Sequence, residues 1–128
     1  MSEPWPDDPA AFMTTYMAAW NAADLDRICD AYNVPALVYQ QGTVYANDDE
    51  KARRTYLGAF LEGTRAELAA GARWESPGHQ VTLAGDGGAV VTTRWVFRRP
   101  DGTVAEDYPD TYVLVRVDGR WAIMADVL

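Results

Sequence analysis

Few side chains in this sequence are of the types that carry chemistry unaided. The chain has one histidine, His79, and one cysteine, Cys29. His79 follows Pro77-Gly78 at a bend in a predicted strand, where it could act as a general base or lie partly exposed without a role. Cys29 lies on the apolar stripe of a predicted helix, which indicates a buried, unreactive thiol. One histidine and one cysteine argue against a zinc site, and we expect neither a metal nor another cofactor.

Carboxylates and tyrosines are the other candidates. The runs Asp7-Asp8 and 48–50 precede predicted helices, where the helix dipole favours negative charge, so we interpret them as solvated helix starts. Asp110 and Asp126 lie inside predicted strands instead, and a carboxylate buried there would need a partner. The chain also has 7 Tyr, 5 Trp and 3 Phe, enough aromatic surface for a core and for an apolar pocket.

The bulk composition limits the classes of function. A chain of 128 residues is long enough for one domain with a hydrophobic core. Its net charge of -8 argues against nucleic acid or an anionic membrane as partner, because phosphate binding needs clustered Lys and Arg. No apolar stretch approaches the roughly 20 residues that span a bilayer. An acidic N-terminus unlike a signal peptide, together with the single cysteine, favours a cytoplasmic protein.

The elements that must position these side chains can be predicted from residue spacing. Asp8-Pro9 indicates the start of a first helix, which residues 21–24 break. A second, short helix capped by Asp24 is expected to carry Tyr32 on its apolar face and to end at Pro35. Residues 1–8 would be an N-terminal tail.

The remaining elements are strands with one helix among them. We expect strands over 36–41 and 43–46, a helix that starts near Glu50 and ends near Gly71, and strands over 73–83, 89–99, 103–117 and 120–127. Tight turns join the last three strands into an antiparallel meander. Helices followed by a meander predict an α+β fold, with residues 9–128 as a single domain.

This order of elements resembles the nuclear transport factor 2-like superfamily over almost the whole chain. Its SnoaL-like and ketosteroid-isomerase-like members are cones: three N-terminal helices pack in the concave face of a curved, mainly antiparallel sheet and leave an internal pocket. The superfamily hosts isomerases, dehydratases, cyclases, epoxide hydrolases and pure binding modules. The resemblance therefore implies a pocket without specifying a reaction.

Several tyrosines and one aspartate resemble the site of the ketosteroid isomerases. Tyr16, in YMAAWNAADLD, falls where that family keeps its oxyanion tyrosine, and Tyr32 and Tyr56 fall where some members keep supporting tyrosines. Asp110, in YPDTY, falls near the strand aspartate that stays protonated and donates a second hydrogen bond to the oxyanion. The alternative is aromatic core packing with mutually bonded hydroxyl groups. For Asp110 the alternative is a hydrogen bond to a turn.

Gln40 departs from that family. It stands where the resemblance implies the general base, an aspartate at the end of the first strand. An amide cannot abstract a proton near neutral pH, so we do not expect the standard isomerase reaction.

Strand alternation divides the last three strands into two sets of side chains. The match at Asp110 implies that its set faces the cone interior: Thr92, Arg94, Val96, Asp110, Tyr112, Leu114, Ala122, Met124 and Asp126. The other set would form an apolar outer face and a homodimer interface: Trp95, Phe97, Val113, Val115, Trp121 and Ile123. A single β-bulge would exchange the two faces of a strand.

Arg94 and Asp126 would then both point into the cavity. Such a pair resembles part of the Asp-Arg-Asp arrangement of limonene epoxide hydrolases, with Asp110 as the second carboxylate. Asp126 could also replace the missing base, or the pair could be a structural link between two strands.

The function we expect from the sequence is a pocket for a small, largely apolar molecule. Its walls would be Trp20, Tyr32, Tyr39, Gln40, Tyr56, Phe60, Tyr112 and Met124. The reaction would be cofactor-free acid–base chemistry on a carbonyl, hydroxyl or epoxide compound, of cyclase, dehydratase or hydrolase type. Tyr16 and Asp110 would stabilise negative charge, and Asp126 or His79 would move the proton. The alternative is a non-catalytic ligand-binding or dimerisation module.

Overall fold

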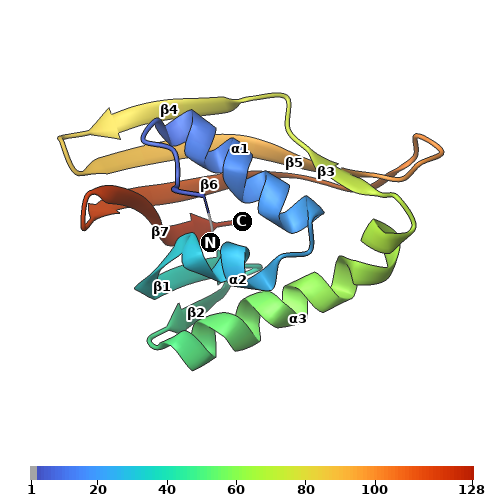
Figure 1. The fold of residues 1–128 in the computed structure, drawn as a ribbon, viewed down its shortest axis with the longest axis horizontal. Helices are drawn as coiled ribbons and strands as arrows, with labels where there is room; N and C mark the ends of the chain where they lie inside the picture. The colour runs from blue at the N-terminus through green and yellow to red at the C-terminus, as the bar shows by residue number, and fades with distance from the viewer. Residues whose placement is uncertain (1–2) are drawn as a thin grey trace.

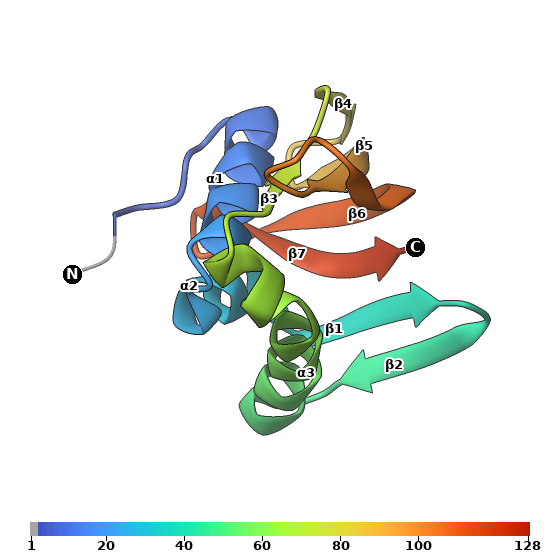
Figure 2. The ribbon, with the colours of Figure 1, turned by 90° about the vertical axis from the view of Figure 1, so that its right-hand side faces the viewer.

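The computed structural model describes residues 3–128, which form three helices and one mixed sheet of seven strands. Figure 1 shows the helices on one side of the sheet, and Figure 2 shows that they cover one of its faces. This is the α+β cone expected from the sequence. The helices are α1 (Pro9–Asn21), α2 (Leu25–Asp30) and α3 (Glu50–Ala69). The strands are β1 (Tyr32–Gln40), β2 (Thr43–Asn47), β3 (Arg73–Glu75), β4 (His79–Ala84), β5 (Gly88–Arg98), β6 (Val104–Val117) and β7 (Arg120–Val127).

The sheet has the strand order β2-β1-β7-β6-β5-β3, and β4 also pairs with β5. Only the β1–β7 pair among these is parallel; β5, β6 and β7 form the expected antiparallel meander. The last strand, β7, therefore lies between β1 of the first hairpin and β6 of the meander.

Each helix begins at an aspartate that accepts a hydrogen bond from the backbone of the first turn. Asp8 accepts from the amide of Ala11, Asp24 from that of Arg27, and Asp49 from that of Ala52. These bonds satisfy amides that have no partner within the helix. The acidic run that ends at Glu50 is thus a helix start, as the sequence indicates.

Tyr32 was expected on the second helix, and the structure corrects this. α2 ends at Asp30, and Tyr32 is the first residue of β1. The cause is pairing with β7: the amide of Ile123 donates to the carbonyl of Ala31 at 2.8 Å, and Tyr32 is the register partner of Ile123. A long-range strand pair has overridden the local helical pattern.

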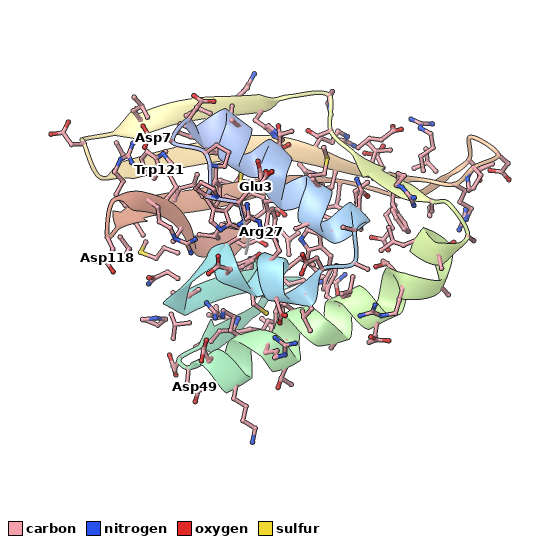
Figure 3. The ribbon with its side chains drawn as sticks, in the orientation of Figure 1. Glu3, Asp7, Arg27, Asp49, Asp118 and Trp121 are labelled. Atoms are coloured by element: carbon pink, nitrogen blue, oxygen red, sulfur yellow. The ribbon has the colours of Figure 1, made fainter. Side chains whose placement is uncertain are left out.

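The segment that precedes α1 packs against the domain. Trp5 lies with its ring 4.9 Å from that of Phe12, and the guanidinium of Arg27 stacks on Trp5 at 3.9 Å. The indole of Trp121 donates to the carbonyl of Asp7 at 2.7 Å, and Figure 3 labels both residues at the same end of α1. Met1 and Ser2, part of the expected tail, lie outside the described residues.

The face assigned to β5 was wrong. Trp95 and Phe97 are buried under the helices, and Arg94 lies on the outer face. The register explains this, because Trp95 pairs with Tyr108 and Thr93 pairs with Asp110, and paired residues share a face. Asp110, Tyr112 and Leu114 of β6 do face inward.

A β-bulge changes the face of β7 midway along the strand. Leu114 pairs with Ile123 and Val113 pairs with Ala125, so Met124 is the extra residue. Trp121 and Ile123 are therefore buried before the bulge, and Asp126 is buried after it. Met124 is 40% exposed, outside the cone.

The apolar outer face consequently differs from the expected one. It is formed by alternate residues of β1, β2, β5 and β7, of which Leu37, Tyr39, Val44, Val90 and Val127 are exposed. None of the helices in the described part of the chain is long and apolar enough to cross a lipid bilayer. Among residues 3–128, no three His, Cys, Asp or Glu side chains gather as a metal site would require.

Candidate functional site: an aromatic pocket with two buried carboxyl groups

A cavity lies between α1, α3 and the inner face of the sheet, and most of its walls are aromatic. It leaves about 40 Å³ for the centres of water-sized molecules, enough for a few waters or a compound of similarly few heavy atoms. The lining residues are Tyr16, Trp20, Tyr32, Tyr56, Leu57, Phe60, Trp74, Trp95, Tyr108, Asp110, Tyr112, Asp126 and Leu128.

Two tyrosines form one arm of a polar network. Tyr16 of α1 and Tyr32 of β1 share a hydrogen bond of 2.8 Å between their hydroxyl groups. Tyr32 in turn lies 3.4 Å from Asp126 Oδ2, to which it donates. Burial raises the pKa of both phenols well above the ordinary value, and nearby Asp126 adds to this. Both tyrosines are therefore uncharged donors at neutral pH.

A tryptophan and a third tyrosine form the second arm. The indole Nε1 of Trp95 donates to the hydroxyl of Tyr112 at 3.0 Å. Because Tyr112 accepts from Trp95, its own proton is free, and its hydroxyl lowers the pKa of the neighbouring Asp110. The two arms thus meet at Asp110 and Asp126, which lie on the neighbouring strands β6 and β7.

The two carboxyl groups are buried against each other. Asp110 is 2% exposed and Asp126 is 5% exposed, and the pair is close enough to share a hydrogen bond. Burial raises the pKa of Asp110 to about 6. Burial, together with Asp110, raises the pKa of Asp126 well above its ordinary value. A hydrogen bond between two carboxyl groups needs a proton on one of them, so Asp126 is the member that keeps it.

Three buried polar atoms at the cavity have no hydrogen-bond partner among residues 3–128. Two are acceptors, Asp110 Oδ1 and Asp126 Oδ1, and the third is a donor, Trp74 Nε1. Buried polar atoms are nearly always paired, so each one is an open position for a proton, a water or a ligand.

Gln40 lies at the edge of this site and not in its wall. Its Oε1 accepts a hydrogen bond of 2.8 Å from the hydroxyl of Tyr56. Burial raises the pKa of Tyr56 to about 12, so the phenol remains the donor. The amide that replaces the expected base therefore holds a wall residue in position.

Two of the expected catalytic residues are not at the cavity. Arg94 forms an ion pair of 2.6 Å with Asp107 on the outer face, where it cannot reach Asp126. His79 is the first residue of β4 and does not line the cavity; its Nδ1 is 2.9 Å from the hydroxyl of Thr93 on β5, and burial lowers its pKa. The expected Arg94–Asp126 pair and a proton transfer by His79 in this cavity are both incompatible with these positions.

Tyr39 and Met124 were expected in the wall and are also on the outside. Each is about half exposed, at 43% and 40%, and neither lines the cavity. Tyr39 alternates with Val38, which is the buried register partner of Asp126. Met124 is the bulged residue of β7.

Sequence reasoning missed five wall residues, Leu57, Trp74, Trp95, Tyr108 and Leu128. Trp95 and Phe97 are large apolar side chains two residues apart, a spacing that favours an inward face. The backbone of Trp74 is tied to the end of α1 by the side-chain amide of Asn21. Asn21 Oδ1 accepts from the N–H of Trp74 at 2.7 Å, and Asn21 Nδ2 donates to the carbonyl of Trp74 at 3.0 Å.

The sequence matches a family model described as NTF2-like protein (DUF6841) over residues 7–127. No curated protein matches the sequence. The match covers nearly the whole chain and agrees with the resemblance inferred from the order of its elements.

Solved structures share the fold at low sequence identity. An NTF2-like protein with a cystatin-like fold from Novosphingobium aromaticivorans has a TM-score of 0.72 and 16% identity, covering 90% of this chain and 74% of that one. Aln2 from a Streptomyces species has a TM-score of 0.72 and 18% identity, covering 97% and 92%. A "putative ketosteroid isomerase" from Shewanella frigidimarina has a TM-score of 0.67 and 21% identity, covering 94% of each chain. Identities this low establish the shared fold and no activity.

Proposed function

The chain belongs to the NTF2-like family DUF6841, and from that premise we propose that its cavity binds a small, largely apolar, oxygen-bearing molecule and performs acid–base chemistry on it. The observation that carries this proposal is the buried carboxyl pair, Asp110 and Asp126, at the meeting point of two hydrogen-bonded arms. Neighbouring carboxyl groups with different proton affinities are a recurrent way to provide an acid and a base at one pH.

The roles follow from which carboxyl group holds the proton. Asp126, whose pKa is raised well above its ordinary value, is the member that holds the proton of the pair and can donate it to a carbonyl, hydroxyl or epoxide oxygen. Asp110, with a pKa of about 6, is mostly ionised and can accept a proton from a carbon or from water. Trp74 Nε1, which lacks a partner in the described chain, could hold a second oxygen of the substrate. Tyr16 acts through Tyr32, which positions Asp126.

This assignment predicts proton exchange on a small ketone. Cyclopentanone, cyclopentanol and cyclopentene oxide share one five-membered ring and present the three oxygen groups. Wild type should exchange the α-hydrogens of cyclopentanone in D₂O or open the epoxide, and Asp110→Asn should lower the rate by about 10²-fold or more. Proton NMR measures both reactions.

Asp107→Asn is the matched control, because it removes a carboxylate of the same strand that faces away from the cavity. Equal rates for Asp110→Asn and wild type would refute the assigned base. Tyr16→Phe, which removes a positioning hydroxyl, should lower the rate several-fold and leave the binding of cyclopentanol almost unchanged.

A second candidate is binding without turnover, and Gln40 favours it. The residue at the family's base position cannot abstract a proton, and Tyr56 occupies its oxygen. Under this alternative cyclopentanone raises the melting temperature, because a ligand of the native state stabilises it, yet its α-hydrogens exchange only at the rate in buffer.

We also propose a homodimer through the outer sheet face that contains Leu37, Tyr39, Val90 and Val127. Each chain carries a net charge of -8, so two copies approach more readily through a surface with few acidic groups, and these four side chains are uncharged. Tyr39→Glu should give a monomer in sedimentation velocity, whereas Leu83→Glu, on the opposite face, should not. A monomeric wild type would refute this interface. A cytoplasmic location remains the expectation from the single cysteine.

A further inference from the structure

The charge of the cavity is not balanced by protein. Its wall holds two carboxyl groups, and no Lys, Arg or His is among the residues that line it. The ion pairs of the described chain all lie elsewhere and include neither Asp110 nor Asp126. A buried charge normally has an opposite charge beside it, so the missing partner is the notable feature of this site.

One shared proton leaves one negative charge in the cavity. The proton kept by Asp126 satisfies the hydrogen bond between the two groups, and Asp110 then remains a carboxylate. Its Oδ1 has no donor within residues 3–128. The hydroxyl groups of Tyr112 and Tyr32 are neutral, so they reduce the free-energy cost of burying this negative charge but cannot cancel the charge.

The walls around that charge suit a cation. The ring of Tyr16 lies 5.8 Å from the ring of Tyr32, 5.8 Å from that of Tyr112 and 6.2 Å from that of Trp95, all edge to face. Such an arrangement presents aromatic faces in several directions, and aromatic faces attract ammonium groups. The -8 net charge of the chain would raise the local concentration of cations further.

We propose that this cavity is a receptor site for a small organic cation, a protonated alkylamine, whose ammonium group lies against the Asp110–Asp126 pair and whose alkyl part contacts the aromatic walls. The inference rests on the pocket of the proposed function and adds a charge to its ligand; it does not require turnover. A molecule with an amino group and an oxygen acceptor would satisfy both the carboxyl pair and Trp74 Nε1.

Binding of a cation is then linked to protons. The ammonium group binds more tightly when Asp110 is ionised. The affinity of the protein for the cation therefore falls as the pH drops below the pKa of Asp110, about 6. The other titratable groups that face the pair have raised pKa values and stay uncharged between pH 5 and 8: Tyr16 of α1, Tyr32 of β1, Tyr56 of α3, and Tyr108 and Tyr112 of β6. Burial and the neighbouring Asp110 raise the pKa of Asp126 as well, so Asp126 takes up a proton more readily than an exposed carboxyl group as the pH falls.

Three probes of one carbon skeleton test the charge of the ligand. Isobutylammonium, isobutanol and isobutyrate are cationic, neutral and anionic at pH 7.5. Isothermal titration and thermal unfolding of the full chain should give isobutylammonium an affinity about tenfold above that of isobutanol, and no binding of isobutyrate. At pH 5 the advantage of the ammonium should shrink to less than about threefold.

Asp110→Asn should remove the preference for the ammonium, whereas the matched Asp107→Asn should keep it. Isobutanol binding as tightly as isobutylammonium, or no binding of isobutylammonium by wild type, would overturn the inference. The two proposals fail separately. Tight isobutanol binding leaves acid–base catalysis intact, and loss of cyclopentanone exchange with intact ammonium selectivity removes only the catalysis.

Discussion

Asp107 and Asp110 lie three positions apart on β6 and on opposite sides of the sheet, and they hold their charges in different ways. Asp107 is on the outer face, half exposed, with Arg94 at 2.6 Å. Asp110 is on the inner face, almost fully buried, with Asp126 as its neighbour and no cation beside it. The same side chain is paired with a cation on the outer face, whereas on the inner face it shares one proton with a second carboxyl group and the pair keeps one negative charge.

The difference shows how side chains on one strand can be specialised by alternation alone. On the outer face water solvates the carboxylate, and Arg94 adds a weak, exposed ion pair. On the inner face desolvation dominates and raises the pKa of Asp110 to about 6. Only the inner aspartate is therefore poised to exchange a proton near neutral pH, which is what an acid–base site needs.

The largest expected effect is a gain of stability from Asp110→Asn. A pKa raised from 3.8 to about 6 means that the native state binds the proton more tightly than the unfolded state. Ionisation of Asp110 thus lowers the free energy of unfolding by on the order of 3 kcal/mol. This destabilisation is complete above pH 6 and vanishes below pH 4. Urea unfolding should find the variant more stable at pH 8 by about that amount, and equal to wild type at pH 4.

A loss of stability at pH 8 would contradict the cost assigned to the buried carboxylate. It would mean that the hydrogen bonds from Tyr112 and the backbone outweigh desolvation. Both aspartates would then be stabilised as carboxylates in the native state, and they would differ only in how strongly.

A smaller loss is expected from Tyr112→Phe. The hydroxyl of Tyr112 accepts from Trp95 Nε1 at 3.0 Å, so its removal leaves a buried indole donor without an acceptor. The free energy of unfolding should fall by about 1–3 kcal/mol. Tyr45→Phe is the matched control, because Tyr45 is 41% exposed, and this variant should stay within about 0.5 kcal/mol of wild type. Equal losses in both variants would show that the hydrogen bond between Trp95 and Tyr112 contributes nothing to stability.

The smallest effect is expected from Asp107→Asn. An exposed ion pair of this kind contributes less than about 1 kcal/mol and is weakened by salt. The difference from wild type at low ionic strength should disappear in 1 M NaCl, as measured by denaturant unfolding. A large loss that salt does not change would show that the outer pair is structural.

The positions of several site residues follow from local spacing. Tyr16 follows from the helical period that starts at Asp8-Pro9. Alternation along β6 places Asp110 and Tyr112 on one face, and the family resemblance at Asp110 assigns that face to the interior. Each of these patterns depends on neighbours in the same element, and the sequence contains them. The cone fold follows in the same way from the order of elements.

Residues whose placement depends on a second strand were not predictable in this way. Arg94 was assigned to the inner face because the position of Asp110 on β6 was carried over to β5 without knowledge of how the two strands pair. Register is a property of two strands, so the sequence of one strand does not contain it. Tyr32 was assigned to a helix because its partner, Ile123, is distant in sequence. Asp110 and Asp126 were both assigned to the interior, and both are buried there. Strict alternation along β7 nevertheless placed Met124 and Trp121 on the wrong faces, because it omits the bulge at Met124.

The bulge at Met124 shifts the alternation of β7 by one residue, so that inward and outward positions are exchanged after it. Upstream of Met124, odd-numbered residues of β7 such as Trp121 and Ile123 face inward, and downstream an even-numbered residue, Asp126, does. Deleting Met124 would restore a single phase and turn Asp126 outward, even though no residue of the cavity wall had been changed. A lineage could thus gain or lose the second carboxyl group by changing the length of one strand by one residue.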